Sequence, residues 1–543
     1  MEQNTKNLSK NFVSKIPKEV SYVTNVLEKA GFEAYLVGGC IRDLLMEIEP
    51  KDWDITTNAK PEQIIGLFEK TIYENTFGTV GVVVLRETPK DKVSQETSDL
   101  NLIIEVTPYR IEGKYSDFRH PEEIKFSNKL EDDLKRRDFT ANAVALNSNG
   151  HVIDMFDGIK DIKDKMLKTV GESDDRFKED ALRMLRAVRF ACQLDFSVSY
   201  ETTESILKNA ELIKKISEER IRDEFVKIIT SANASSGVVM LHRFGLLKHI
   251  IPELEEGIGC EQLGEHIYDV WDHLLHAVQH AANKNWSLEI RLAALFHDIG
   301  KPRTRRLAES VLTKNSGAFA LGDKKTGDPR RVEFLSGQTS KNNSARKKYT
   351  FYGHEVVGAK MAKKIMERLK FSKKEIELVD KLVRNHMFFS DTELITLSAV
   401  RRIIAKVGTE NIWLLMNVRE CDRVGMKKKE APYRLRKYFA MIEEAMRDPI
   451  SVGQLKIDGE FMIKELGIKP GPRMGWILHA LLEEVLDNPE KNTVENLSKL
   501  VKSLDKLNNT ELKALGDKGK EKKEELEEEE ISKLREKHGV RKK

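Results

Sequence analysis

The spacing of apolar residues changes once along this chain, near residue 160, and that change limits the folds it can adopt. Before it, β-branched runs such as 78–85 and 102–111 alternate with short helical patterns, which is typical of a domain that mixes strands and helices. From Asp161 onward the spacing is helical almost without interruption. We therefore expect an α+β fold, in which an N-terminal domain with a mixed sheet precedes an all-helical body.

Length and composition set broad limits on the class of protein. At 543 residues the chain is long enough for several domains. Its net charge of +4 is the small difference between 92 basic and 88 acidic residues, so it indicates an acidic partner only weakly. The four cysteines are far apart, which favours free thiols in a reducing compartment. Because the sequence has no run of about 18 apolar residues, we expect a cytoplasmic protein without a membrane span.

The stretch 36–57, LVGGCIRDLLMEIEPKDWDITT, holds the first candidate site. If DWDIT forms a strand, its period of two places Asp52 and Asp54 on one face, where two carboxylates suit Mg²⁺. Adjacent glycine N–H groups and a guanidinium can hold a triphosphate, and the candidates are Gly38, Gly39 and Arg42. Together these groups would form a two-metal phosphoryl-transfer site. The same residues also permit a polar turn, in which the arginine pairs with Asp43 on the surface.

The spacing GG-x-x-R-D … D-x-D resembles the signature of polymerase-β-type nucleotidyltransferases. Within them, LVGGCIRDLL…PKDWDITTNAKPEQI resembles the class II tRNA nucleotidyltransferase and bacterial poly(A) polymerase family. The likeness continues in Glu105–Phe126, which resembles the family's flexible loop, and in LEDDLKRRDFTANAVAL (Leu130–Leu146), which resembles its ribose-binding motif. It implies a polymerase-β-like head in which Arg137 and Asp138 contact the nucleotide, with Asp138 accepting from the ribose 2′-OH.

The stretch DRFKEDALRMLRAVRFACQLDF reads as one amphipathic helix, and its polar residues at three- and four-residue steps include Glu179, Asp180, Arg183 and Arg186. Cytosine and adenine both offer an exocyclic amine beside an accepting ring nitrogen. A carboxylate that accepts and an arginine that donates therefore suit both bases. EDALRMLR resembles the EDxxR motif of class II CCA-adding enzymes. The resemblance implies that Asp180 and Arg183 read the base, that Glu179 orients the arginine and that Arg186 belongs to the nucleotide site. Ordinary ion pairs along a helix would show the same spacing.

Histidines and aspartates of the helical half indicate a second chemistry. His297 and Asp298 are adjacent in RLAALFHDIGKP, and imidazole with carboxylate suits a transition metal or Mg²⁺. The order H…HD…H…H…D resembles the HD phosphohydrolase superfamily. That resemblance implies a core metal quartet of His273, His297, Asp298 and Asp422, with accessory positions at His354 and His386. Any single histidine could instead be a buried core residue.

We predict five segments from these patterns. They are a nucleotidyltransferase head at 1–158, a helical neck and body at 159–262, an HD domain at 263–430, a helical tRNA-binding region at 431–505 and a charged tail at 506–543. The HD domain carries a basic insertion at 308–350, and the tail is expected to form a solvated helix or to be disordered. In the fourth segment KPGPRMG offers Lys469 and Arg473 to a phosphate, unless it only caps a helix.

The resemblance implies template-independent addition of CCA to the 3′ end of tRNA from CTP and ATP, with Mg²⁺ in the head and release of pyrophosphate. Other functions stay open: addition of only A or only CC beside a partner enzyme, poly(A) synthesis, or an HD metal-dependent phosphohydrolase acting on RNA 3′ ends. A divalent metal is possible in the HD domain, and the sequence leaves the oligomeric state open.

Overall fold

The computed structural model describes residues 4–7, 13–74, 78–85, 101–112, 124–262, 267–307, 349–387, 395–426, 432–448, 451–513 and 515. The chain forms two compact units. The first comprises Met1–Glu255, Val278–Arg291 and Ile365–Lys373, and the second comprises Glu256–Ala277, Leu292–Lys364 and Lys374–Lys543. Two segments of the predicted HD domain therefore pack in the first unit.

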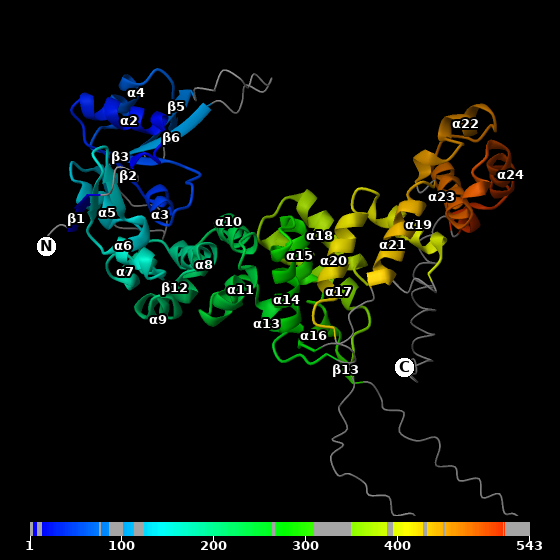
Figure 1. Ribbon diagram of the computed structural model, residues 1–543. Helices are drawn as coiled ribbons and strands as arrows, with labels where there is room; N and C mark the ends of the chain where they lie inside the picture. Colours follow the sequence, from blue (N-terminus) through cyan, green and yellow to red (C-terminus); the bar gives the residue numbers. More distant parts are fainter. Residues whose placement is uncertain are drawn as a thin grey trace, which may run out of the picture. The chain divides into compact units, whose positions relative to one another are not determined.

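The first unit begins with an eight-stranded sheet in the order β1-β10-β9-β2-β3-β6-β5-β4. Its strands are β1 (Asn4–Asn7), β2 (Ala34–Val37), β3 (Asp54–Thr57), β4 (Thr71–Glu74), β5 (Thr79–Leu85), β6 (Asn101–Pro108), β9 (Val144–Asn147) and β10 (His151–Asp154). Of these strands, β1, β2, β3, β5 and β6 are labelled in Figure 1. Strands β3 and β6 are parallel, and the other neighbouring pairs are antiparallel. The predicted mixed sheet is confirmed. A separate antiparallel pair joins β7 (Arg110–Glu112) to β8 (Ile124–Phe126).

Helices cover both faces of this sheet. Successive strand residues point to opposite faces, so neighbouring residues of β2 pack against different helices. Leu36 belongs to a core that includes residues of α2 (Lys18–Lys29) and α4 (Pro61–Leu67). Its neighbour Val37 packs instead with residues of α5 (Leu130–Lys135). The end of β2 is therefore fixed from two sides, and α3 (Gly39–Leu45) begins two residues beyond it.

The rest of the first unit is mainly helical. Its helices are α6 (Gly158–Lys163), α7 (Ser173–Glu179), α8 (Leu182–Leu194), α9 (Tyr200–Asn209), α10 (Glu218–Ile229), α11 (Ala234–Arg243), α12 (Leu247–Ile250) and α13 (Pro252–Glu255), with short strands β11 (Met166–Leu167) and β12 (Ser197–Val198). Helix α8 packs against α10 and α11, and most of its residues are buried. It is the central helix of this part.

The single helix predicted over 175–196 is wrong, because the chain breaks it at Asp180. Helix α7 ends at Glu179 and α8 begins at Leu182. Asp180 between them has an extended backbone, with φ −139° and ψ 104°. Its Oδ1 accepts a hydrogen bond from the Leu182 N–H at 3.0 Å, which satisfies a donor at the start of α8.

A segment from later in the chain, 278–291, packs in the first unit through hydrogen bonds from its side chains to backbone carbonyls. Arg291 Nη1 donates to the Ile229 carbonyl at 3.0 Å and to the Ser231 carbonyl at 2.7 Å. Gln279 Nε2 donates to the Ala232 carbonyl at 2.8 Å. These donors cap the end of α10 and the loop after it.

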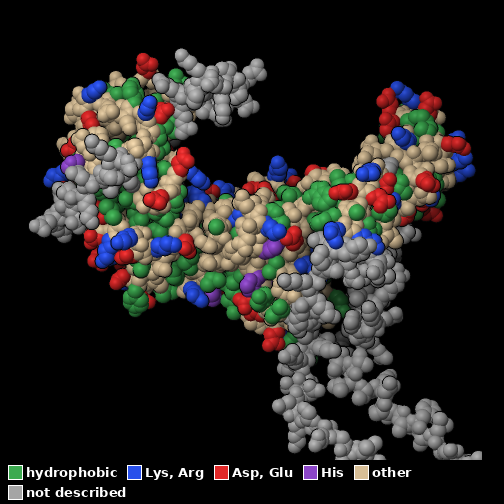
Figure 2. Space-filling view, in the orientation of Figure 1, with side chains coloured by type: hydrophobic (Ala, Val, Ile, Leu, Met, Phe, Trp, Pro, Cys, Tyr) green, Lys and Arg blue, Asp and Glu red, His purple; other side chains and the backbone are tan. Residues whose placement is uncertain are grey.

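The second unit is helical. Its helices, some of which begin or end in the first unit, are α14 (Val270–Asn283), α15 (Leu288–Phe296), α16 (Lys301–Thr304), α17 (His354–Arg368), α18 (Lys373–Asn385), α19 (Leu397–Val407), α20 (Ile412–Asp422), α21 (Pro432–Ala445), α22 (Gly459–Lys464), α23 (Pro472–Asp487) and α24 (Val494–Leu504). Leu512, which we assigned to the tail, is buried in the core of α22–α24. The surface over α22 and α24 carries basic and acidic side chains side by side (Figure 2).

Parts of three predicted segments lie outside the described residues: 113–123 of the flexible loop predicted at 105–126, 308–348 of the basic insertion predicted at 308–350, and 514 and 516–543 of the tail predicted at 506–543. Of the insertion's edges, β13 (Arg306–Leu307) pairs with β14 (Tyr349–Thr350). Among the helices that the structure describes, none combines the length and apolar content needed to cross a bilayer.

Candidate active site and metal cluster

Gly38 forms the turn between β2 and α3 (Gly39–Leu45). Its φ is 83°, and a Cβ at this position would lie 3.2 Å from Arg137 Nη1 and 3.3 Å from Asp54 Oδ2. The left-handed backbone and the close approach both favour glycine. The turn therefore brings a guanidinium and a carboxylate from distant parts of the sequence to the start of α3.

The two candidate metal-binding carboxylates flank a buried tryptophan. Strand β3 begins at Asp54, so Asp52 lies just before the strand. Trp53 is buried, Asp52 is exposed and Asp54 is half-buried, an alternation that agrees with both carboxylates pointing away from the indole. Burial raises the pKa of Asp54, Arg137 lowers it and Asp52 raises it. Glu105, which the sequence analysis did not single out, is the Cα partner of Asp54 on β6.

Arg42 is buried, not on the surface, and it belongs to a network of five side chains. It binds Asp43 Oδ1 through Nε at 2.9 Å and Nη2 at 2.6 Å, and its Nη1 donates to Asn142 Oδ1 at 2.7 Å. Asn142 Nδ2 donates to Asp138 Oδ1 at 3.1 Å. Asp138 Oδ2 accepts from Arg186 Nε at 2.8 Å and Nη2 at 2.6 Å. Asn142, which was not predicted from the sequence, therefore connects Arg42 to Asp138, and Asp138 connects directly to Arg186.

The charges in this network hold Asp138 ionised. Burial raises the pKa of its carboxyl, but Arg186, the hydrogen bond from Asn142 and Arg183 outweigh that effect and hold the pKa well below its usual range. Arg186 is stabilised in turn, because its carboxylate neighbours raise its pKa against the effect of burial.

A fully buried carboxylate, that of Asp133, anchors the two arginines of the RRD motif, which comprises residues 136–138 of the predicted ribose-binding stretch. It accepts from Arg136 Nε at 2.9 Å, from Arg136 Nη2 at 2.6 Å and from Arg137 Nη2 at 3.0 Å. Despite complete burial, these arginines lower the pKa of Asp133. Its bond to Arg137 Nη2 leaves Nη1 beside Gly38.

The two predicted base-reading residues have different partners. Arg183 Nη1 binds Glu179 Oε2 at 2.6 Å, and its Nη2 donates to the Arg136 carbonyl at 3.2 Å. Asp180 Oδ2 instead accepts from Arg220 Nη2 at 2.6 Å, a donor on α10. Arg183 thus links the break between α7 and α8 to the RRD motif of the head.

The second unit gathers all six residues predicted for the HD site, and each is buried. They form two overlapping groups of potential metal ligands: His273, His297, Asp298 and Asp422, and Asp298, His354 and His386. The Nε2 atoms of His273 and His297 lie 3.4 and 3.3 Å from Asp298 Oδ2. The Nε2 atoms of His354 and His386 lie 3.2 and 3.6 Å from Asp298 Oδ1.

Backbone carbonyls orient three of these imidazoles. The Nδ1 atoms of His297, His354 and His386 lie 2.9, 2.7 and 2.6 Å from the carbonyls of Ala294, Phe351 and Val383. Because each Nδ1 donates there, each of these imidazoles in its neutral form would present the lone pair of Nε2 to a metal. Asp422 Oδ2 accepts from Arg419 Nη1 at 2.8 Å.

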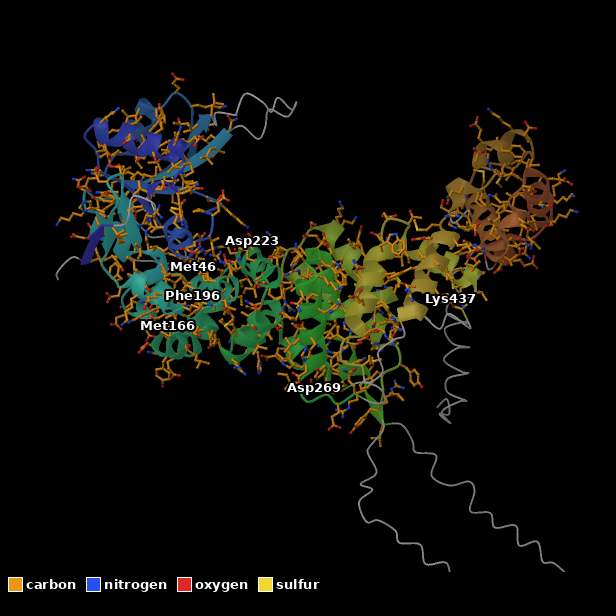
Figure 3. The ribbon with its side chains drawn as sticks, in the orientation of Figure 1. Met46, Met166, Phe196, Asp223, Asp269 and Lys437 are labelled. Atoms are coloured by element: carbon orange, nitrogen blue, oxygen red, sulfur yellow. The ribbon has the colours of Figure 1, made fainter. Side chains whose placement is uncertain are left out.

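Neighbouring residues set the charge of this cluster and stabilise the start of α14. Asp298 and Asp422 raise the pKa of His297 to about 10 against the effect of burial. Lys301, which the sequence analysis missed, places Nζ 2.6 Å from Asp298 Oδ2 and donates to Gln262 Oε1 at 2.6 Å. Asp269, labelled in Figure 3, accepts from the Asp272 N–H at 2.7 Å at the start of α14, the helix that carries His273.

Arg473, a candidate phosphate contact, is engaged inside the C-terminal helices. Its guanidinium donates to Asp505 Oδ1 at 3.1 Å, Asn509 Oδ1 at 2.6 Å and the Leu507 carbonyl at 2.8 Å. These bonds tie the start of α23 to the turn after α24 and account for the arginine without a phosphate.

Three domain families match the chain in sequence. The poly(A) polymerase head domain matches residues 34–168, the probable RNA and SrmB-binding site of polymerase A matches 195–258, and the HD domain matches 270–427. The last match includes the two segments that pack in the first unit.

The chain is similar to proteins described as CCA-adding enzymes. The one from Ligilactobacillus salivarius is 32% identical over 500 residues, which is 90% of this chain and 98% of that protein. The one from Lactobacillus delbrueckii subsp. bulgaricus is 48% identical over 207 residues, which is 38% of this chain and about half, 48%, of that protein.

Solved structures share the fold. A Bacillus stearothermophilus CCA-adding enzyme in complex with CTP has a TM-score of 0.60 at 24% identity, covering 92% of this chain and 98% of that one. A Thermotoga maritima CCA-adding enzyme complexed with tRNA has a TM-score of 0.52 at 17% identity, covering 93% and 100%. At these identities the likeness concerns the fold.

Proposed function

This chain belongs to the CCA-adding enzyme family, and from that premise we propose that it adds CCA to the 3′ end of tRNA from CTP and ATP without a nucleic-acid template. The observation that carries the proposal is the meeting of Asp54 and Arg137 at Gly38, because it joins a metal-binding carboxylate to a triphosphate-binding cation. The relatives are described as CCA-adding enzymes, which favours this product over poly(A) and over A or CC alone. A tRNA substrate also favours a cytoplasmic enzyme.

Asp52 and Asp54 would hold a divalent metal, which we propose is Mg²⁺. The fit is chemical: two neighbouring carboxylates, one with a pKa raised by burial and by the other's charge, are stabilised by a cation. Mg²⁺ bound there supplies electrostatic activation of the attacking 3′-hydroxyl and of the leaving pyrophosphate.

The chain's own residues bind and orient the nucleotide. Arg42 and Arg137 bind triphosphate oxygens, and each is held by a buried polar partner, Asn142 or Asp133. Asp138, ionised by its arginine neighbours, accepts from the ribose 2′-OH. Fixing these groups before the substrate arrives lowers the entropy cost of aligning the α-phosphate with the 3′-hydroxyl.

Base selection rests on the break between α7 and α8. Asp180 accepts from the exocyclic amine of cytosine or adenine, and Arg183 donates to the ring nitrogen. Arg220 fixes the Asp180 carboxylate, and Glu179 fixes the Arg183 guanidinium. Guanine and uracil present the reverse pattern, so they would leave buried groups unpaired.

A second activity is supported by the cluster in the HD domain, where we propose one bound divalent metal and phosphohydrolysis at RNA 3′ ends. The support is the convergence of buried imidazole Nε2 atoms on Asp298, with Nδ1 of three histidines already bound to carbonyls. Lys301 beside Asp298 would offer a cation to a substrate phosphate.

One incubation tests the transferase and separates the two sites. Purified protein with MgCl₂ and a tRNA ending at the discriminator base receives CTP, ATP or both. We expect complete CCA only with both nucleotides, no incorporation with Asp54→Ala and full incorporation with His297→Ala. Runs of A of open length would indicate a poly(A) polymerase, and no incorporation by the wild type on any tRNA end would refute the proposal.

A further inference from the structure

Asn142 joins the two halves of the proposed nucleotide site. Its Oδ1 accepts from Arg42 Nη1 at 2.7 Å and its Nδ2 donates to Asp138 Oδ1 at 3.1 Å. We propose that Asn142 is a positioning residue that couples the triphosphate contact of Arg42 to the ribose contact of Asp138. The inference rests on the proposed function, because it takes those two contacts from it.

The backbone that carries this amide is fixed by the head. Asn142 closes the 3₁₀ turn η2 (Thr140–Asn142). The Thr140 N–H donates to the Lys168 carbonyl at 2.9 Å, and its hydroxyl donates to Asp161 Oδ2 at 2.6 Å. A Cβ on Gly158 would lie 2.2 Å from the Thr140 carbonyl oxygen, so α6 packs directly on the turn. Asn142 is 7% exposed, so few other partners can reach its amide.

The chemistry of the two neighbours requires an amide between them. Arg42 can only donate and the ionised Asp138 can only accept, so the residue between them must accept on one side and donate on the other. This requirement also fixes which end of the amide faces which partner. Aspartate has the same shape but would present an acceptor to the Asp138 carboxylate, and alanine would present neither group.

The network extends from Asn142 to the neck. Asp138 Oδ2 is held by two bonds from Arg186 on α8, at 2.8 and 2.6 Å. Arg186 thus fixes the position of Asp138 Oδ2, and Asn142 fixes the position of Asp138 Oδ1. Its loss would release Arg42 and reorient Asp138 together, so triphosphate affinity and the preference for a ribose should change in the same variant.

The test measures binding of CTP and of 2′-deoxyCTP, each with MgCl₂ and without tRNA, by calorimetry on the full chain. We expect Asn142→Asp to weaken CTP binding by about ten- to a hundredfold, since a hydrogen bond to a charged group is lost and a like charge is introduced. The ratio of the two affinities should fall by about tenfold, because the 2′-OH contact depends on Asp138.

Asn209→Asp is the matched control. Asn209 is also 7% exposed, and its Nδ2 donates to Asp174 Oδ1 at 3.0 Å, so the substitution creates the same carboxylate pair away from the nucleotide site. We expect both variants to have a lower melting temperature than the wild type. Only Asn142→Asp should change the affinities for CTP and 2′-deoxyCTP. Asn142→Ala, which adds no charge, should weaken CTP binding in the same direction.

Two outcomes would overturn the proposal. One is an unchanged affinity and sugar preference in a folded Asn142→Asp variant. The other is loss of the folded head in both Asn142 variants while the Asn209 control folds, because Asn142 would then be needed for the fold. The binding readout is independent of tRNA, so a wild type that binds CTP but adds nothing to tRNA would refute the proposed function and leave the role of Asn142 testable.

Discussion

Replacing Asp133 with alanine should destabilise the first unit and weaken nucleotide binding in the same variant. Asp133 is fully buried and accepts three hydrogen bonds, at 2.6, 2.9 and 3.0 Å, from Arg136 and Arg137. Removing one partner of a buried ion pair costs about 3–5 kcal/mol. The two arginine side chains are 16% and 17% exposed and can regain some water, so we expect the lower end, about 3 kcal/mol.

A loss of about 3 kcal/mol corresponds to a melting point lower by about 6–12 °C in a cooperative unit of this size. The assay is thermal unfolding followed by circular dichroism, together with KM for CTP. Freeing Arg137 from its anchor should raise KM by about tenfold, the value of one charge-assisted hydrogen bond. Glu211→Ala is the control, because it removes an exposed partner of Lys214 and should change neither quantity.

The result that would refute the reasoning is an Asp133→Ala variant whose melting point and KM both match the wild type. A lower melting point with an unchanged KM would show that Asp133 stabilises the fold but is not needed to orient Arg137.

Three further predictions concern the remaining sites. Burial raises the pKa of Asp54, so its ionised form destabilises the folded state above that pKa. Without Mg²⁺, Asp54→Asn should melt at a higher temperature than the wild type at pH 7.5, and the difference should vanish as the pH falls below 3.8, the ordinary pKa of this carboxyl. A wild type that melts above Asp54→Asn at pH 7.5 would contradict this sign. His297→Ala should lose the divalent metal that we expect to copurify with the wild type, as measured by elemental analysis, while CCA addition continues; equal metal content would disprove the assignment. Arg473→Ala should lower the melting point of the C-terminal helices and leave tRNA affinity, measured by filter binding, within about twofold, because its donors are engaged by the chain itself.

Functional groups that belong to local motifs can be predicted from the sequence. Asp54 is predicted as a potential metal ligand from its spacing to Asp52, and the six residues of the HD cluster are implied by the resemblance of their order to that of the HD superfamily. The order was informative because each member lies at or near a helix end, where it can face a common centre. In the structure all six are buried in the second unit, where they form two overlapping groups of potential metal ligands.

Residues whose role depends on a distant partner were missed. Asn142, Asp133 and Lys301 are ordinary polar residues until Arg42, Arg137 and Asp298 lie beside them. The break at Asp180 was hidden for a similar reason, because the flanking residues have helical spacing and the extended backbone is stabilised by Arg220 from another helix. Glu105 joins Asp54 only through the parallel pairing of two strands.

The later segment 278–291, which packs in the first unit at the end of α10, has a consequence for any attempt to divide this protein. A version truncated at residue 262 would keep the head and neck motifs and still lose Gln279 and Arg291. The carbonyls of Ile229, Ser231 and Ala232 would then turn to solvent at the end of α10, the helix that holds Asp180 through Arg220. Removing the HD domain would therefore also remove residues that pack in the first unit. Its excision would need a graft that restores those donors, and its gain or loss in related chains would have to be accompanied by repair of the neck.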